Sequence, residues 1–317
     1  MHTQPTLEPI PLDANKYTRG SLLVLAGSVR YCGAGVLATL AAEKTGAGYV
    51  SLATPSGAAA VARQHLLCSP VIEGPEAKGT GAFDATAFSA ILKEAHHIDA
   101  LCCGPGLTVN SDTIAFVGEV LKHAAVHGIP LLLDADALNA LSAEPALLDE
   151  RRAQNGPPGE EDSAEGSPVS AHAQAPLILT PHTGELARLR ASFQGRSSSQ
   201  RLASGLAVRE AATELAQELG ATVVAKGPTT FITDGSCWVE SSEGTPALAK
   251  AGTGDVLAGI ISSLLAQGVP AGDAAVLGVQ IHSQAGIHAE REVGRRSVTA
   301  LDVIRGIPAA LTTFESV

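Results

Sequence analysis

Short apolar runs that alternate with alanine-rich helical patterns are the feature of this 317-residue sequence that most restricts its fold. Each run is apolar at consecutive positions and is bounded by Gly, Pro or polar turn residues, which is typical of strands buried on both faces of a parallel sheet. The alternation predicts a doubly wound, mainly parallel α/β fold with helices on both faces. The predicted strands are 22–26, 49–54, 98–103, 129–133, 177–180 and 222–226, and the helices between them include 34–44, 113–126 and 202–219.

The pattern changes after the last of these strands. The dipeptide Asp234-Gly235 separates two short apolar segments, 230–233 and 237–240, and predicts a hairpin that gives the sheet an antiparallel edge. Three helical segments then close the chain, at 253–266, 273–290 and 299–311. We therefore expect residues 1–317 to form a single domain.

One stretch does not fit this core. Between residues 153 and 175, Val169 is the only large aliphatic residue among Gly, Pro, Glu, Ser and Ala. Such a segment buries too little apolar surface to offset the entropy lost on ordering it. We expect a flexible insertion over 153–175.

Composition excludes several functional classes. The chain has 32 Asp and Glu residues against 21 Lys and Arg, a net charge of −11 that repels phosphate backbones, so we expect no nucleic-acid partner. No apolar run reaches the roughly 18 residues of a membrane span, and the first sixteen residues do not resemble a secretory signal. The five cysteines are odd in number and two are adjacent, which suits neither a disulfide framework nor a zinc site. These features predict a cytoplasmic protein without a membrane partner.

The segment Lys250-Ala-Gly-Thr-Gly-Asp255 carries the strongest chemical signal. Two glycines precede an apolar helix, so free backbone N–H groups and the helix dipole can bind a phosphoryl group there. We predict an anion hole at Gly252, Thr253 and Gly254. Asp255 would stand at its mouth, where a carboxylate can take the proton of a hydroxyl that attacks a phosphate. An acidic residue in a first helical turn is also ordinary capping, so the neighbouring motifs decide.

Further polar motifs follow four predicted strands. They are Gly104-Pro-Gly-Leu107, the acids Asp134 and Asp136, Thr180-Pro-His-Thr-Gly-Glu185, and Lys226-Gly-Pro-Thr-Thr230. Open α/β sheets bind ligands at the carboxyl ends of their strands, so this convergence predicts a site there. The last motif offers a lysine and backbone amides suited to nucleotide phosphates.

These segments, in this order, resemble the ribokinase-like superfamily and, within it, the nucleotide-dependent NAD(P)H-hydrate dehydratases. The resemblance spans roughly residues 16–312 and depends mainly on Thr180-Pro-His182 with Gly184-Glu185 and on Leu248-Ala-Lys-Ala-Gly-Thr-Gly-Asp255. It departs from the family pattern at Thr183, where proline is usual, and at 28–32. Some members carry an N-terminal epimerase domain. Only fifteen residues precede Lys16, so we expect that activity to be absent.

The resemblance implies a repair enzyme that dehydrates the S epimer of hydrated NADH or NADPH, while ADP or ATP is converted to AMP or ADP plus phosphate. It implies magnesium as the counter-ion of the nucleotide, and leaves the metal-contacting residues open. By position, Asp255 would be the catalytic base and would also contact the hydrate. The other implied contacts are Ala34, Gly106 and His182 for the hydrate, and Lys226, Gly227, Pro228, Thr229, Thr230 and Gly254 for the nucleotide. Magnesium or phosphate contacts are conjectured for Asp134, Asp136, Asn139 and Glu185.

Two alternatives stay open. A vitamin-precursor kinase of the same fold, acting on a hydroxyethylthiazole or a hydroxymethylpyrimidine, would share the anion hole and Asp255 but stop after phosphoryl transfer. A nucleotide-binding module without catalysis would not need a carboxylate against the phosphates. The alanine-rich helices are also compatible with a homo-oligomer.

Overall fold

The computed structural model describes residues 5–155, 174–195, 202 and 204–315. Within this part of the chain, nine strands form one sheet in the order β3-β2-β1-β4-β5-β6-β7-β8-β9. Neighbouring strands from β3 to β7 pair parallel, and β7, β8 and β9 pair antiparallel. The strands are β1 Ser21–Leu25, β2 Tyr49–Pro55, β3 Val71–Gly74, β4 Ala100–Cys103, β5 Leu131–Leu133, β6 Leu177–Leu179, β7 Thr222–Ala225, β8 Thr230–Thr233 and β9 Trp238–Ser241. The predicted doubly wound fold with an antiparallel edge is confirmed.

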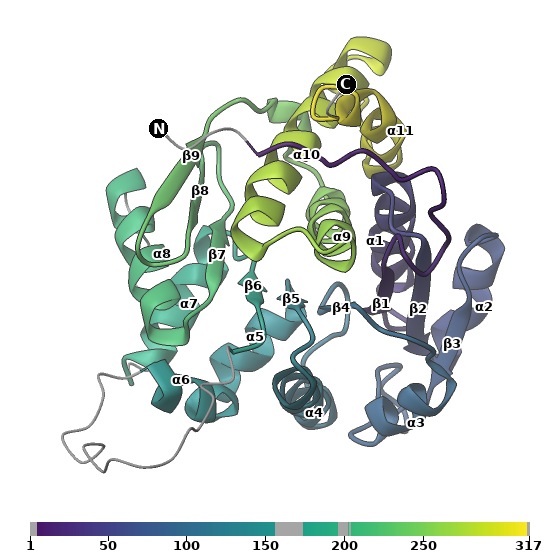
Figure 1. The fold of residues 1–317 in the computed structure, drawn as a ribbon. Helices are drawn as coiled ribbons and strands as arrows, with labels where there is room; N and C mark the ends of the chain where they lie inside the picture. The colour runs from purple at the N-terminus through teal and green to yellow at the C-terminus, as the bar shows by residue number, and fades with distance from the viewer. Residues whose placement is uncertain (1–4, 156–173, 196–201, 203, 316–317) are drawn as a thin grey trace.

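Helices cover both faces of the sheet (Figure 1). Helices α1, α9, α10 and α11 pack on one face around a core that includes Leu22 and Val24, and α3, α4, α5, α7 and α8 pack on the other around Leu23 and Leu25. Because side chains alternate along a strand, consecutive residues of β1 enter opposite cores, which explains its unbroken apolar run. The α-helices are α1 Cys32–Thr45, α2 Ser56–His65, α3 Ala87–Glu94, α4 Ser111–His127, α5 Asp136–Ala143, α6 Asp149–Asn155, α7 Thr183–Phe193, α8 Gly205–Leu219, α9 Thr253–Ala266, α10 Ala271–Val293 and α11 Ala300–Leu311.

The sequence-based assignment was accurate for long or strongly patterned elements and missed short ones. Strand β8 and helix α9 have the predicted bounds. Strand β3 was missed because it has four residues at the sheet edge, one of them the exposed Glu73. Helices α2, α3, α5, α6 and α7 were also not predicted, since each has eleven residues or fewer and therefore shows too few turns for a helical period to stand out.

The flexible insertion predicted at 153–175 falls mostly on residues outside the described part of the chain, but its two ends, 153–155 and 174–175, are described. Residues 153–155 complete helix α6, and Ala175 is buried immediately before β6. Arg151 contributes to this ordering, because its guanidinium donates hydrogen bonds to the carbonyl oxygens of Leu219 and Ala175. Residues 156–173 lie outside the described part of the chain.

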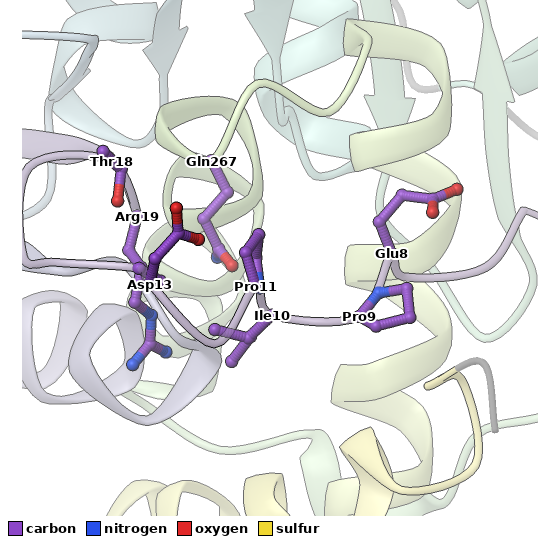
Figure 2. Close-up of a pocket in the computed structure, with 9 residues that line it drawn as sticks. Glu8, Pro9, Ile10, Pro11, Asp13, Thr18, Arg19 and Gln267 are labelled. Atoms are coloured by element: carbon purple, nitrogen blue, oxygen red, sulfur yellow. The ribbon is translucent and has the colours of Figure 1, made fainter.

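The amino ends of the strands border a hollow, whereas the carboxyl ends carry the polar sequence motifs. At the amino ends, a hollow of about 380 Å³ lies between residues 8–19 and Gln267, which follows α9 (Figure 2). Motif residues do not line this hollow; they follow the carboxyl ends of the strands, at the opposite edge. Among the described residues, none of the helices is both long enough and apolar enough to cross a membrane.

Candidate active site

A buried ion pair joins the ends of two strands. Asp134 directly follows β5 and is 1% exposed, and its Oδ1 lies 2.7 Å from Nζ of Lys226, which follows β7. The hydroxyl of Thr180, after the intervening strand β6, donates to the same oxygen over 2.8 Å. Parallel pairing of β5, β6 and β7 brings these residues to one edge. Burial lowers the pKa of Lys226, but Asp134 and Glu185 raise it by more, so the ammonium stays charged.

The N-terminus of α9 opens toward this pair. Its first residues follow Gly252, which caps the helix with a left-handed backbone (φ +91°) and has no side chain to satisfy the N–H groups of the first turn. The hydroxyl of Thr253 lies 2.7 Å from the carbonyl oxygen of Leu248 and donates to it, which fixes the turn. A Cβ added at Gly254 would lie 3.5 Å from Nζ of Lys226 and 4.0 Å from Oδ2 of Asp134. The backbone N–H of Thr253 donates to the carbonyl oxygen of Lys250 over 3.4 Å, whereas the N–H of Gly254 has no acceptor among the described residues. The amide of Gly254 and the ammonium of Lys226 therefore lie at the same space.

Asp255 is the third residue of α9 and lies at this opening. Burial, followed by the negative charge of Asp134, raises the pKa of its carboxyl to about 7, although Lys226 opposes the shift. Within the described residues it has neither an ion pair nor a side-chain hydrogen bond. An unpaired carboxyl whose pKa lies near neutrality has the properties of a general base.

His182 and Glu185 form a reciprocal cap on α7. The imidazole Nδ1 of His182 accepts hydrogen bonds from the backbone N–H groups of Gly184 (2.9 Å) and Glu185 (3.3 Å), and Oε2 of Glu185 accepts from the backbone N–H of His182 (2.8 Å). Burial, then the charges of Lys226 and Arg188, lower the pKa of His182, consistent with a neutral ring whose Nδ1 accepts. The predicted hydrate contact is thus half-exposed and already oriented by its own helix.

Glu185 is only 6% exposed, and burial raises its pKa to about 7. The backbone N–H of Lys226 donates to the carbonyl oxygen of Pro181 over 2.8 Å, which ties the His182 turn to the buried ion pair. Sequence reasoning named Glu185 only as a conjectured magnesium or phosphate contact. Its spacing of three residues from His182 was the available signal for the cap.

Asp136 does not join the buried pair. Its Oδ2 accepts from the backbone N–H of Thr108 over 2.8 Å, and its Oδ1 accepts from Asn139, which in turn accepts from Arg188. Ala135, between the two acids, has φ +51° and ψ −113°, a strained conformation for a residue with a Cβ. This backbone turn directs Asp134 into the site and Asp136 toward the loop after β4. Asp136 and Asn139 therefore support that loop.

Two predicted hydrate contacts, Gly106 and Ala34, lie close together, because the loop after β4 packs against the start of α1. Gly106 has φ +66°, and a Cβ added there would lie 2.8 Å from the Cβ of Ala34 and 2.8 Å from the Cβ of Tyr31. Only glycine fits between these side chains.

The predicted nucleotide loop, Lys226–Thr230, joins β7 to β8 at the same strand ends, and Gly227 and Pro228 are exposed. The structure thus brings the predicted residues to one edge of the sheet.

The fold and this helix N-terminus define the class of protein. A crystal structure described as a ribokinase-like superfamily protein from Enterococcus faecalis matches with a TM-score of 0.73 and 20% identity over 98% of this chain and 93% of that chain. The ADP/ATP-dependent NAD(P)H-hydrate dehydratase of Bacillus subtilis, co-crystallised with ATP and Mg²⁺, matches with a TM-score of 0.71 and 24% identity over 98% of this chain and 95% of that chain. The fold is therefore ribokinase-like.

Sequence comparison defines the family more closely. The family model for NAD(P)H-hydrate dehydratase matches residues 22–309, so the chain belongs to this family. It is 32% identical over 316 residues to the ADP-dependent (S)-NAD(P)H-hydrate dehydratase of Xanthomonas campestris, covering 96% of this chain and 92% of the relative. It is 35% identical over 298 residues to the bifunctional NAD(P)H-hydrate repair enzyme Nnr of Moorella thermoacetica, covering 93% of this chain. The chain spans about half the length of that bifunctional relative (50%).

Proposed function

We propose that this protein dehydrates the S epimer of hydrated NADH and NADPH, with ADP as phosphoryl donor. The observation that carries the proposal is the meeting of the α9 N-terminus, Lys226 and the unpaired Asp255 around one space at the strand ends. The name of the Xanthomonas relative, which matches along nearly its whole length, supports the substrate and the donor.

In this mechanism Asp255 takes the proton of the ring hydroxyl while the hydroxyl oxygen attacks the terminal phosphorus of the nucleotide. The bond between that phosphorus and the bridging oxygen breaks, and AMP leaves. Amides of Gly252–Gly254 and the ammonium of Lys226 stabilise the charge on the transferred group. The ring nitrogen then supplies electrons as the carbon–oxygen bond breaks and phosphate leaves, and loss of a ring proton restores the reduced nicotinamide.

Magnesium enters this proposal as the counter-ion of the nucleotide. In the described part of the chain, no three His, Cys, Asp or Glu side chains gather as a metal cage. The acidic groups at the strand ends still fit magnesium, which proteins hold through one or two carboxylates together with substrate phosphates and water. Asp134, which pairs with Lys226, and Glu185, whose charge raises the pKa of Lys226, are carboxylates that could take this role, and the ion would neutralise phosphate charge. The magnesium requirement and the cytoplasmic location remain predictions.

The direct test is an absorbance assay at the reduced-nicotinamide band with purified NADH hydrate, magnesium and either ADP or ATP. We expect a nucleotide-dependent rise with equimolar phosphate release. A stable phosphorylated product without phosphate release, on a hydroxyethylthiazole or hydroxymethylpyrimidine, would instead establish the vitamin-precursor kinase. A hydroxyethylthiazole kinase from Pyrococcus horikoshii shares the fold with a TM-score of 0.54 and 15% identity.

We expect kcat/KM for the hydrate to rise with pH through about 7. The pKa of Asp255 is raised to about 7, so below this value the carboxyl is protonated and cannot accept the hydroxyl proton. Glu185 has a pKa raised to about the same value, so Glu185→Gln is the matched variant. The acid limb should persist in Glu185→Gln. Its loss in that variant would assign the ionisation to Glu185.

A further inference from the structure

Two large apolar side chains are exposed in the loop that precedes the predicted hydrate contact Ala34. Val29 is 52% exposed and Tyr31 is 45% exposed, although both belong to the short loop between β1 and α1. Single exposed apolar residues are common on protein surfaces and need no explanation by themselves. These two differ because the loop that presents them is held by several hydrogen bonds.

The loop is fixed on both sides. Ser28 is fully buried, and its carbonyl oxygen accepts from the backbone N–H of Tyr31 over 3.1 Å. The backbone N–H of Val29 donates to the carbonyl oxygen of Gly81 over 2.8 Å, and the carbonyl oxygen of Tyr31 accepts from the backbone N–H of Ala34 over 3.2 Å. An exposed ring on a fixed backbone loses little entropy when it binds a ligand.

Tyr31 borders the hydrate contacts directly. Its Cβ lies 2.8 Å from the position that a Cβ on Gly106 would occupy, and Ala34 lies equally close to that position. The guanidinium of Arg30 stands 5.3 Å from the centroid of the Tyr31 ring. Arg30 has no carboxylate partner among the described residues. On a protein with a net charge of −11, a cation without a carboxylate partner and an aromatic ring therefore stand together beside the predicted hydrate contacts Gly106 and Ala34.

We propose that Arg30 and Tyr31 form a subsite for the dinucleotide, in which the Tyr31 ring stacks on a planar base ring and Arg30 contacts an adjoining phosphate. The inference depends on the proposed function for the identity of the ligand. Aromatic stacking and an arginine–phosphate contact together suit a nucleotide. The thiazole or pyrimidine ring of a vitamin-precursor alcohol can also stack on Tyr31, but it carries no phosphate for Arg30 to contact.

Binding of NADPH, the expected product, tests the subsite without turnover. We expect Tyr31→Ala to raise the Kd for NADPH about tenfold and Tyr31→Phe to leave it within about twofold, because phenylalanine keeps the stacking face. Arg30→Gln should raise the Kd several-fold at low salt and much less at high salt, as expected for a screened phosphate contact. The Kd for ADP should not change in these variants.

The chain offers a matched control pair. Arg209 stacks on Trp238, which is 46% exposed on the edge strand β9, with 4.6 Å between guanidinium and ring centroid. Trp238→Ala and Arg209→Gln should leave NADPH binding unchanged. Reduced nicotinamide mononucleotide distinguishes the two rings: if its Kd also depends on Tyr31, the nicotinamide ring stacks, and if it does not, the adenine ring stacks.

The subsite and the proposed function can fail separately. If wild-type protein repairs the hydrate but Tyr31→Ala and Arg30→Gln both bind NADPH within twofold of wild type, the subsite is wrong and the function stands. If wild-type protein shows no repair yet binds NADPH in a Tyr31-dependent way, the dehydratase function is wrong and the subsite stands. Equal weakening of ADP and NADPH binding in Tyr31→Ala would also overturn the subsite, since it would indicate a general structural defect.

Discussion

Replacing Asp255 with asparagine should abolish hydrate repair while adenine nucleotide still binds. Asparagine keeps the size of the side chain and leaves the backbone amides of Gly252–Gly254 in place, but it cannot accept the proton of the attacking hydroxyl. Loss of a positioned general base costs about 10²- to 10⁴-fold in rate. We therefore expect kcat to fall by at least two orders of magnitude, with a Kd for ADP within a few-fold of wild type.

The same variant should be more stable than wild type at pH 8. In the folded protein the pKa of Asp255 is about 7, against a usual value of 3.8, so its ionisation above neutrality opposes folding. This penalty is absent below pH 4, accumulates as pH rises toward 7 and then stays constant. Removing it should stabilise Asp255→Asn by on the order of 2 kcal/mol at pH 8, measured by urea unfolding.

Asp273 provides the control, because it is also the third residue of a helix, α10, follows a glycine and is exposed. Asp273→Asn should retain wild-type repair and gain no stability at pH 8. Wild-type turnover by Asp255→Asn would show that the base assignment is wrong. Loss of ADP binding in that variant would show that Asp255 acts mainly by holding the nucleotide.

Replacing Lys226 with methionine should have the largest effect on stability. Asp134 has a side chain only 2% exposed, and Lys226 is the cation that neutralises it at 2.7 Å. Without the ammonium, the buried carboxylate keeps only the hydroxyl of Thr180 as a side-chain donor. Breaking a buried ion pair on one side typically costs about 3–5 kcal/mol, and we expect a loss of this size at neutral pH.

A double-mutant cycle separates this cause from lost packing. Asp134→Asn combined with Lys226→Met removes both charges, so the double variant should regain a large part of the stability that Lys226→Met loses. The exposed pair of Arg63 and Glu73, with side chains 51% and 44% exposed, is the control. Arg63→Met should cost less than about 1 kcal/mol. A similarly small cost for Lys226→Met would mean that Asp134 is not held as a buried charge.

Hydrate repair should be lost in both Lys226 variants, whatever their stability. The ammonium lies beside Gly254 at the predicted phosphate position, and neither methionine nor asparagine supplies a positive charge there. The double variant is therefore informative, because it should fold well and still fail to bind ADP as wild type does. Wild-type affinity for ADP in the double variant would remove Lys226 from the nucleotide site.

Local sequence determined the strands that carry the site and the edge at which they end, whereas the four-residue edge strand β3 was not predicted. Runs such as Leu22–Val24 are apolar at every position because they are buried on both faces, and this pattern can be read without a structure. Since parallel strands end at a common edge, the polar motifs after β4, β5, β6 and β7 could be placed together. The glycines before α9 likewise predicted a helix N-terminus open to an anion.

Only the tertiary structure decided how the polar residues share these roles. Asp134 and Asp136 are two positions apart and look equivalent in sequence, yet the positive φ of Ala135 sends one to Lys226 and the other to Thr108. The raised pKa of Asp255 depends on burial and on the charge of Asp134, which lies on a different strand end far away in sequence. Hydrophobic pattern and turn chemistry act locally and can be read from the sequence, whereas charge pairing and burial depend on distances that the packed chain alone creates.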